Sequence, residues 1–338
     1  MKTFVAVVLL SLSIISFTGV GTAKPATVTE PQASPDQPTR RPDNFGELSL
    51  GELQKLADAG NGKAQDELAL RYSLGTGGAE KDKAKAVEWY RKASANGIVT
   101  AYFNLGVAYY NGDGVRISED ESCKWFVLAA DAGMAQAQEA ANRAQAGLSP
   151  QRFHDCQLLA ANAYYLGKEI KQDYPRAMGW YLKLAEENDG RASERVAVMY
   201  DHGWGVTQDQ SQSVVWLRRA ADQGNSLARY ELGRLYELGI RVPQDYANAR
   251  KLYEAAANDL FTPAMVALSK MSSEGRGVKV NIQTAYMWAV LAANQKNVEG
   301  NKLAETLSKQ LNEKQIADAK KEASQHFSGR LGFFTPKQ

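Results

Sequence analysis

Tryptophan recurs along the chain at a fixed interval, and this spacing most constrains how the chain can fold. Trp89 and Trp125 lie 36 residues apart, and Trp180 and Trp216 repeat that interval. Trp288 lies two further intervals along, with a leucine at the midpoint. A fixed period in this range is typical of stacked supersecondary units. The spacing predicts six copies of one unit, with 19 extra residues between the second and the third.

Each unit has the pattern of two amphipathic helices joined by a turn that contains glycine. In the second unit, Ala101, Leu105 and Tyr109 recur at helical spacing, Gly112 interrupts the pattern, and a second helical pattern contains Trp125. Apolar residues spaced in this way give each helix one face that must be buried against a neighbour. Glycine permits positive φ at the turn. The Asp, Ser or Asn seven residues before each Trp position is predicted to cap the second helix.

The full pattern is A-x-x-x-L-G-x-x-Y-x-x-G-x-G-V-x-x-D-x-x-x-A-x-x-W-x-x-x-A-A-x-x-G. It resembles the Sel-one-like repeat family, which is similar to the tetratricopeptide class, and the resemblance covers about residues 64–296. The third unit departs from the pattern because Ala160 stands where leucine is usual, and Ser272 replaces tyrosine in the last unit. The resemblance implies an all-α fold, a right-handed superhelical solenoid of six antiparallel helix pairs.

The extra residues predict an orphan helix after the second unit. Ala137, Ala141 and Ala144 form a helical stripe, and Ser149 with Pro150 can begin the next helix as N-cap and first helical residue. A flexible loop is the alternative, but residues 134–146 are mostly good helix formers.

Segments outside the repeats complete the predicted organisation, and Ser49 and Asn312 are predicted to cap terminal helices. Residues 24–46 hold five of the ten prolines, which indicates an extended spacer or a mere unfolded leader. The expected segments are a signal peptide at 1–23, a Pro-rich disordered linker at 24–46, an N-terminal capping helix at 47–63, units one and two at 64–136, the inserted helix at 137–155, units three to six at 156–299, and C-terminal capping helices with a tail at 300–338.

Residues 1–23 have the features of an export signal. Lys2 precedes an apolar stretch over residues 4–17, and small residues then suit cleavage before Lys24. An uncleaved N-terminal anchor is the alternative, although the stretch is shorter than the roughly 20 residues that a spanning helix needs. We therefore expect an exported protein in the periplasm, with a secreted or N-terminally anchored protein as alternatives, and no stable membrane insertion after cleavage.

The sequence contains no recognisable catalytic or metal-binding pattern. His154, His202 and His326 lie in different parts of the chain, and none has a second His or Cys at ligand spacing. No nucleophile has a base nearby in a known motif, and the glycines at 75–78 lack the Lys-Ser/Thr of a phosphate loop. The net charge is only +2, whereas a nucleic-acid binder needs a basic surface. We expect no catalytic residues, metal, cofactor or nucleic-acid partner.

Cys123 and Cys156 are the only cysteines. If consecutive helices are antiparallel, the two helices that carry them are parallel, and both cysteines lie near the start of their helix. A disulfide across the orphan helix would close a loop of about 30 residues and stabilise the fold by about 3 kcal/mol. The alternative is two separate buried thiols.

The resemblance also implies that the first helix of each unit lines the concave face. Tyr165, Tyr230 and Arg234 are the predicted anchors of a bound polypeptide, because aromatic and Arg side chains commonly anchor interfaces. A solvated face, with binding through the linker or the loop around Trp204, is the alternative. The residues expected on this face are Tyr110, Asn111, Asn162, Tyr165, Asp201, His202, Tyr230, Arg234, Glu237, Lys270 and Glu274.

These observations predict a non-enzymatic interaction scaffold of the bacterial cell envelope or exterior. We expect a monomer that binds a protein or peptide on the concave face. The alternatives are a cell-wall-fragment-binding or hydrolytic, β-lactamase-like member of the same family, and a secreted host-interacting factor.

Overall fold

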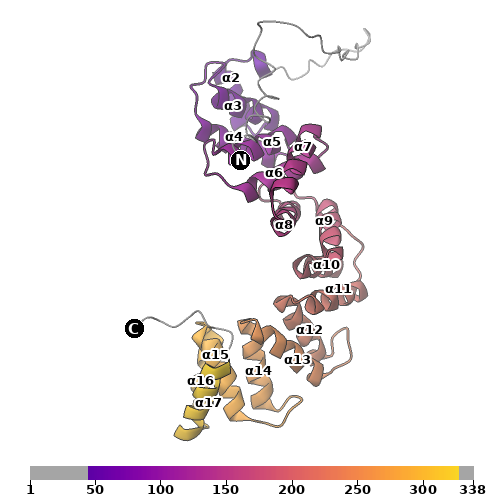
Figure 1. The fold of residues 1–338 in the computed structure, drawn as a ribbon, viewed down its shortest axis with the longest axis vertical. Helices are drawn as coiled ribbons and strands as arrows, with labels where there is room; N and C mark the ends of the chain where they lie inside the picture. The colour runs from indigo at the N-terminus through magenta and orange to yellow at the C-terminus, as the bar shows by residue number, and fades with distance from the viewer. Residues whose placement is uncertain (1–44, 327–338) are drawn as a thin grey trace. The chain divides into compact units, whose positions relative to one another are not determined.

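The computed structural model describes residues 45–326, and helices are the only regular secondary structure in that range (Figure 1). It contains a short 3-10 helix, η1, and sixteen α-helices. The all-α prediction is therefore confirmed. The predicted signal peptide, the linker up to residue 44 and the tail from residue 327 lie outside the described residues.

The described helices follow one another with short connections. They are η1 (Phe45–Glu47), α2 (Leu50–Asp58), α3 (Gly62–Leu74), α4 (Lys83–Ala95), α5 (Val99–Asn111), α6 (Glu119–Asp131), α7 (Ala135–Gly147), α8 (Pro150–Leu166), α9 (Tyr174–Glu186), α10 (Gly190–His202), α11 (Gln210–Asp222), α12 (Ser226–Leu238), α13 (Tyr246–Asn258), α14 (Thr262–Glu274), α15 (Ile282–Asn294), α16 (Val298–Ser308) and α17 (Glu313–His326).

The chain divides into two compact units, one up to Asp173 and one from Tyr174. In the first unit, α3 packs on α4 and α5 on α6, and α4 contacts α5. In the second unit, α10 packs on α11, α12 on α13 and α14 on α15. The inserted helix that the sequence predicts after the second repeat does not mark this boundary. The boundary falls after α8 because α8 packs on α6, inside the first unit.

Five of the six predicted caps of the second helices are confirmed. The side chain of each accepts a hydrogen bond from a backbone N–H in the first turn of its helix, which satisfies a donor that the helix itself leaves unpaired. The capping residues are Asp82, Ser118, Asp209, Asp245 and Asn281.

Glycine is required where the turn of one pair approaches the second helix of the preceding pair. Gly114 has φ +74°, and a Cβ there would lie 2.3 Å from the carbonyl oxygen of Lys83. Small residues also let the two helices of a pair approach each other. A Cβ at Gly106 would lie 2.7 Å from the Phe126 ring, and one at Gly233 would lie 2.7 Å from the Tyr253 ring.

Large aromatic side chains fill the space between neighbouring helices. Trp89, Trp125 and Trp288 are buried, and Trp125 is completely inaccessible to solvent. Trp180 and Trp216, which occupy the same position of their units, are half-buried. The Trp spacing thus marks a packing position, and the interior that it fills supplies most of the stabilisation of each helix pair.

The insertion forms helix α7, which packs on α6 and makes only a few contacts with α8. Ser149 caps α8 through the backbone N–H of Arg152, and Pro150 is its first residue, as predicted. Because α8 begins at that proline, residues 150–155 belong to α8 and not to the inserted helix, whose predicted range reached residue 155.

Arg71 of α3 holds the first described residues of the chain in place. Its side chain is 4% exposed and pairs with Glu67. Its guanidinium also donates hydrogen bonds to the backbone carbonyls of Phe45, Gly46 and Leu48. Phe45 and Gly46 were expected in the linker, but these contacts hold them in η1.

The terminal helices cover the ends of the array. Ser49 caps α2, as predicted, and it also forms a capping box with Glu52. Helices α16 and α17 pack on α15, and Leu307 and Ala319 are buried there. Asn312 caps α17 through the backbone N–H of Gln315. Among the helices of residues 45–326, none combines the length and apolar composition needed to cross a membrane.

Candidate interaction surface

The structure places every predicted surface residue on the first helix of a pair, and none of them is buried. Four lie in the first compact unit and seven in the second, so each group is described within its own unit. In the first unit they are Tyr110 and Asn111 on α5 and Asn162 and Tyr165 on α8; in the second they are Asp201 and His202 on α10, Tyr230, Arg234 and Glu237 on α12, and Lys270 and Glu274 on α14.

Tyr230 is the aromatic centre of the surface on α12 and α14. Its ring is tilted against Tyr253 at 5.6 Å and against Phe261 at 5.5 Å between ring centroids. The guanidinium of Arg234, one turn later, lies 5.9 Å from the Tyr230 ring and pairs with Glu231 at 3.2 Å. Tyr230 is thus held in place by packing, while Arg234 remains exposed.

Glu237 stabilises this surface through hydrogen bonds to its neighbours. Its carboxylate accepts hydrogen bonds from the Tyr253 hydroxyl at 2.6 Å and from Arg276 at 2.5 Å, and its side chain is only 12% exposed. Burial, together with the hydrogen bond to Glu237, raises the pKa of Tyr253 well above its ordinary value. Glu237 therefore organises its neighbours and presents little area to a partner.

Charges of both signs surround Tyr230. Lys270 pairs with Glu299 of α16 at 2.5 Å, and Arg276 pairs with Glu274. A mosaic of paired charges suits a mixed polypeptide better than a polyanion, which requires an excess of basic groups. The sequence analysis identified Lys270 and Glu274 but missed Arg276 and Glu299, because neither lies on the exposed face of a first helix by its position in the unit.

The end of α10 carries a separate aromatic group. The imidazole of His202 stacks on Trp204 at 4.4 Å, and Trp204 stacks on Tyr174 at 5.3 Å. Asp201 pairs with Arg241 at 2.5 Å. The structure thus brings the two predicted residues of α10 beside the Trp204 loop. Tyr174 and Arg241 were not anticipated, because the sequence does not show which turns meet.

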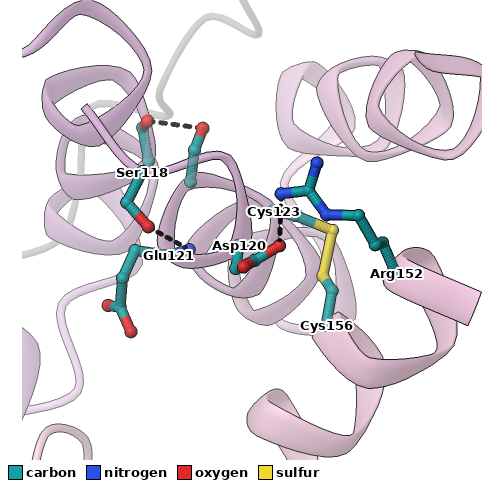
Figure 2. Close-up of a disulfide and its surroundings, with 8 residues drawn as sticks. Ser118, Asp120, Glu121, Cys123, Arg152 and Cys156 are labelled. Carbon is teal, nitrogen blue, oxygen red and sulfur yellow. Dashed lines mark hydrogen bonds and ion pairs between the residues drawn. A yellow bond between two sulfur atoms is a disulfide. The ribbon is translucent and has the colours of Figure 1, made fainter. Parts of the chain in front are cut away.

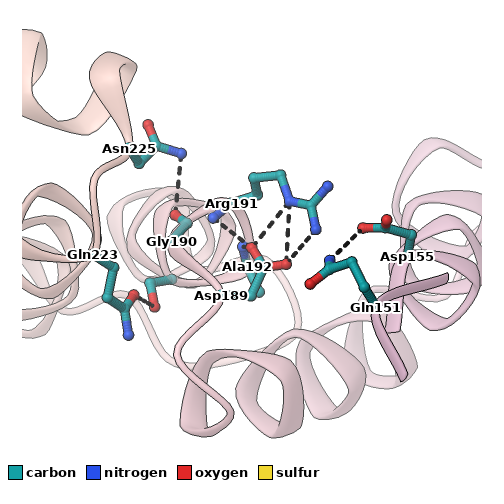
Figure 3. Close-up of polar contacts among 9 residues, drawn as sticks. Gln151, Asp155, Asp189, Gly190, Arg191, Ala192, Gln223 and Asn225 are labelled. Carbon is teal, nitrogen blue, oxygen red and sulfur yellow. Dashed lines mark hydrogen bonds and ion pairs between the residues drawn. The ribbon is translucent and has the colours of Figure 1, made fainter. Parts of the chain in front are cut away.

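A polar network braces the start of α10 (Figure 3). Asp189 caps the helix through the backbone N–H groups of Arg191 and Ala192, and its carboxylate also pairs with the Arg191 side chain at 2.7 Å. The amide of Asn225 donates to the Gly190 carbonyl at 3.1 Å. This arrangement ties α10 to the turn before α12, so its role is structural.

Tyr110 lines a pocket in the first unit. The pocket has a volume of about 240 Å³ and lies between α5, α6 and α7. Burial, and to a smaller extent the charge of Glu119, raises the pKa of Tyr110. On α8, the carbonyl of Tyr165 accepts a hydrogen bond from the Gln172 side chain at 2.9 Å.

Cys123 of α6 and Cys156 of α8 form a disulfide, with 6.0 Å between their Cα atoms (Figure 2). Both residues are buried. Beside the bridge, Arg152 pairs with Glu119 at 2.6 Å and Asp120 at 2.7 Å. The sequence analysis placed such a bridge across the inserted helix. The two cysteines instead lie on directly packed helices, because α8 returns to α6 after α7.

The described part of the chain holds no cluster of three or more His, Cys, Asp or Glu side chains suited to a metal ion. His202 lies in the aromatic group of α10, and the His326 ring contacts Trp288 edge-on at 4.9 Å. These histidines therefore have packing partners of their own.

A comparison with protein families matches the Sel1 repeat six times. The matched residues are 62–98, 99–134, 154–189, 191–225, 226–259 and 262–297. The matches correspond to the six helix pairs, since the ranges begin at or near the first helix of each pair.

The solved structures to which the chain is similar include three Sel1-type proteins. One is a protective antigen of uropathogenic Escherichia coli strains that displays an SLR fold (27% identity, 83% of this chain and 65% of that chain covered, TM-score 0.45). Another is a Sel1 repeat protein from Oxalobacter formigenes (29% identity, 76% of this chain and 79% of that chain covered, TM-score 0.45). A third is from Klebsiella pneumoniae (16% identity, 67% of this chain and 100% of that chain covered, TM-score 0.26). The chain thus spans slightly less than two thirds of the Escherichia coli protein. None of the curated proteins compared with the chain matches it.

Proposed function

Because the chain belongs to the Sel1 repeat family, we propose that it is a non-enzymatic scaffold of the bacterial cell envelope or exterior that binds a polypeptide segment on the first helices of its units. Proteins of this family are generally protein-interaction scaffolds. Stacked helix pairs expose a continuous row of first helices, and arrays of this kind offer extended binding surfaces.

The observation that carries the proposal is the aromatic and basic pair on α12. Tyr230 is half-buried and fixed by two aromatic neighbours, and Arg234 lies over its ring with the guanidinium exposed. A rigid aromatic side chain beside an Arg is the combination found most often at interface hot spots, because little conformational entropy is lost on binding. Lys270 on the next first helix adds a charge that can contact the same segment.

Two features support a location outside the cytoplasm. The sequence of residues 1–23 has the charge, apolar stretch and small residues of an export signal. The disulfide between Cys123 and Cys156 would persist in an oxidising compartment and would be reduced in the cytosol.

The proposal is tested by identifying a partner and then changing the surface. Crosslinking in cells followed by mass spectrometry identifies proteins bound to the chain. The double variant Tyr230→Ala with Arg234→Glu is then expected to weaken capture of that partner at least about tenfold, since hot-spot residues each contribute 2 kcal/mol or more.

Arg218→Glu is the matched control. Arg218 lies 5.9 Å from the Tyr236 ring, so it repeats the Arg–Tyr geometry, but it belongs to a second helix, α11. This variant is expected to capture the partner as the wild type does. If the double variant remains folded by circular dichroism and still captures the partner at wild-type affinity, the surface on α12 and α14 is not the binding site.

A further inference from the structure

The pocket of the first unit has mostly apolar walls. Val107 comes from α5, Phe126 from α6, Ala140 and Ala144 from α7, and Leu148 from the segment after α7. Of its lining residues, the sequence analysis anticipated only Tyr110 as a surface contact. The pocket therefore adds a feature that the repeat pattern does not contain.

The inserted helix explains why the pocket exists. Helix α7 packs on α6, but most of the side chains that it turns to the pocket are alanines, and it ends in Gly147. These residues bring the α7 backbone close without filling the space beside α5. Protein interiors contain few voids larger than a water molecule. A pocket of about 240 Å³ is thus a space that an apolar group can enter.

The pocket is preformed. Cys123 is one of its lining residues, and its disulfide to Cys156 ties this wall of α6 to α8. Ligand pockets in proteins are usually largely formed before binding, and a fixed wall lowers the entropic cost of binding.

The volume selects the size of the group that fits. Pockets for drug-sized ligands have about 300–1,000 Å³. An apolar cavity of about 150 Å³ is enough to bind benzene. A pocket of about 240 Å³ lies between these limits and suits a single aromatic side chain, up to the size of indole.

Two charged residues line the pocket, Glu119 and Arg143, and their charges determine which group can lie next to a bound aromatic ring. Glu119 is held by Arg152 at 2.6 Å. Arg143 pairs with Glu139 at the longer distance of 3.5 Å, and the Glu139 side chain is 75% exposed. An exposed ion pair of this kind contributes little. Arg143 can therefore exchange it for a carboxylate carried by a ligand, which favours an acidic group beside the ring.

We propose that this pocket binds the aromatic side chain of a polypeptide in which an acidic residue is adjacent to the aromatic one. The ring enters between α5, α6 and α7, and the carboxylate pairs with Arg143. The choice of a polypeptide rests on the proposed function, but the site is separate from Tyr230 and Arg234.

The test uses the chain from Lys24 to Gln338 with ¹³C-labelled alanine methyl groups and the probe acetyl-Trp-Glu-amide. The methyl signals of Ala140 and Ala144 are expected to shift, whereas that of Ala256, buried in the second unit, is not. Acetyl-Trp-Gln-amide should bind about threefold more weakly, because it loses an exposed ion pair. Acetyl-Ala-Glu-amide should bind at least about tenfold more weakly, because it lacks the ring.

Ala144→Leu fills the pocket, and Ala146→Leu places the same side chain on an exposed position of the same helix. Ala144→Leu should weaken binding of acetyl-Trp-Glu-amide at least about tenfold, and Ala146→Leu should leave it unchanged. Absence of shifts at Ala140 and Ala144, or wild-type binding by Ala144→Leu, overturns the proposal. Binding of free indole without binding of the dipeptide overturns the polypeptide assignment.

The double variant Tyr230→Ala with Arg234→Glu separates this site from the proposed function. It should bind acetyl-Trp-Glu-amide as the wild type does, whether or not it captures the partner found by crosslinking. Loss of dipeptide binding in this variant would place the dipeptide on α12 and overturn the assignment to α7.

Discussion

Asp66 of α3 is a carboxylate whose environment disfavours its charge. Its Oδ1 is buried without a hydrogen-bond partner in the described residues, and its Oδ2 accepts a hydrogen bond from Thr100 at 2.5 Å. Burial is the main cause that raises the pKa of Asp66, and the charge of Glu67 adds to it. Burial of Tyr90 itself, followed by the charges of Asp66 and Glu67, raises the pKa of Tyr90.

The raised pKa of Asp66 predicts a stability that falls as the pH rises. The folded state binds the proton more tightly than the unfolded state, so the stabilisation is present below the unfolded pKa and is lost as the pH rises through the folded pKa. Asp66→Asn keeps the acceptor for Thr100 and removes the charge. We expect it to raise the melting temperature at pH 7 by about 2–4 °C, corresponding to about 1 kcal/mol, and to give no increase at pH 3.

The control for this prediction is Asp58→Asn, at an exposed position at the end of α2. It should change the melting temperature little at either pH. The two substitutions could change the melting temperature equally, or Asp66→Asn could raise it by the same amount at pH 3 and pH 7. Either result would show that burial of Asp66 does not govern this pH dependence.

Single residues were predictable where their role is local. Asp82, Ser118 and Asn281 were identified as caps from their position before a helical pattern, because capping depends on only three or four consecutive residues. The pairing of Glu237 with Tyr253 and Arg276 was not predictable, since Tyr253 comes from α13 and Arg276 from the turn after α14. The candidate surface was therefore predicted as a set of positions and not as a network.

At the scale of the helices, the disulfide between α6 and α8 predicts which helix is less stable when the two cysteines are not bridged. The cysteines are separated by 33 residues, and the closed loop contains α7. Because the bridge limits the unfolded chain, the variant Cys123→Ser with Cys156→Ser should lose about 3 kcal/mol of stability in urea denaturation. In this variant, the amide hydrogens of α8 should exchange faster with solvent than those of α3, which lies outside the loop closed by the disulfide.

Alkylation with iodoacetamide checks the bridge directly. The protein isolated from the extracytoplasmic compartment that we propose for it should gain no label under denaturing conditions without reductant, and two labels after reduction. Two labels before reduction would show that both thiols are free. The disulfide could then not cause the predicted loss of stability in the double Cys→Ser variant.

The boundaries of helix α8 illustrate what a repeat pattern can and cannot predict. Counting units placed the start of the third repeat at Cys156, because that residue occupies the position of the opening alanine. Ser149 and Pro150 start the helix earlier, since a cap and a proline at the first position act on the local backbone independently of the repeat. The longer helix gives α8 more length to pack on α6.

At the scale of the whole molecule, the division after Asp173 decides which part of the chain can fold by itself. The repeat pattern alone predicts that two repeats end at residue 136. In the structure, α6 is covered by α7 and α8, and Cys123, Phe126 and Leu128 of α6 are buried. A fragment that stops at residue 136 lacks both covering helices and the partner cysteine.

We therefore expect residues 45–173 to form a cooperatively folded fragment with the disulfide intact, and residues 45–136 to be less stable. In a solenoid each element is stabilised by its direct neighbours, so removal of α7 and α8 exposes the apolar residues of α6 without disturbing the α3–α4 pair. The melting temperature of the shorter fragment should be at least about 10 °C lower, which corresponds to roughly 2 kcal/mol at this size. Thermal denaturation followed by circular dichroism measures this difference. Equal melting temperatures would mean that α7 and α8 add nothing to the first unit and that the division lies at the insertion, where the repeat pattern alone places it.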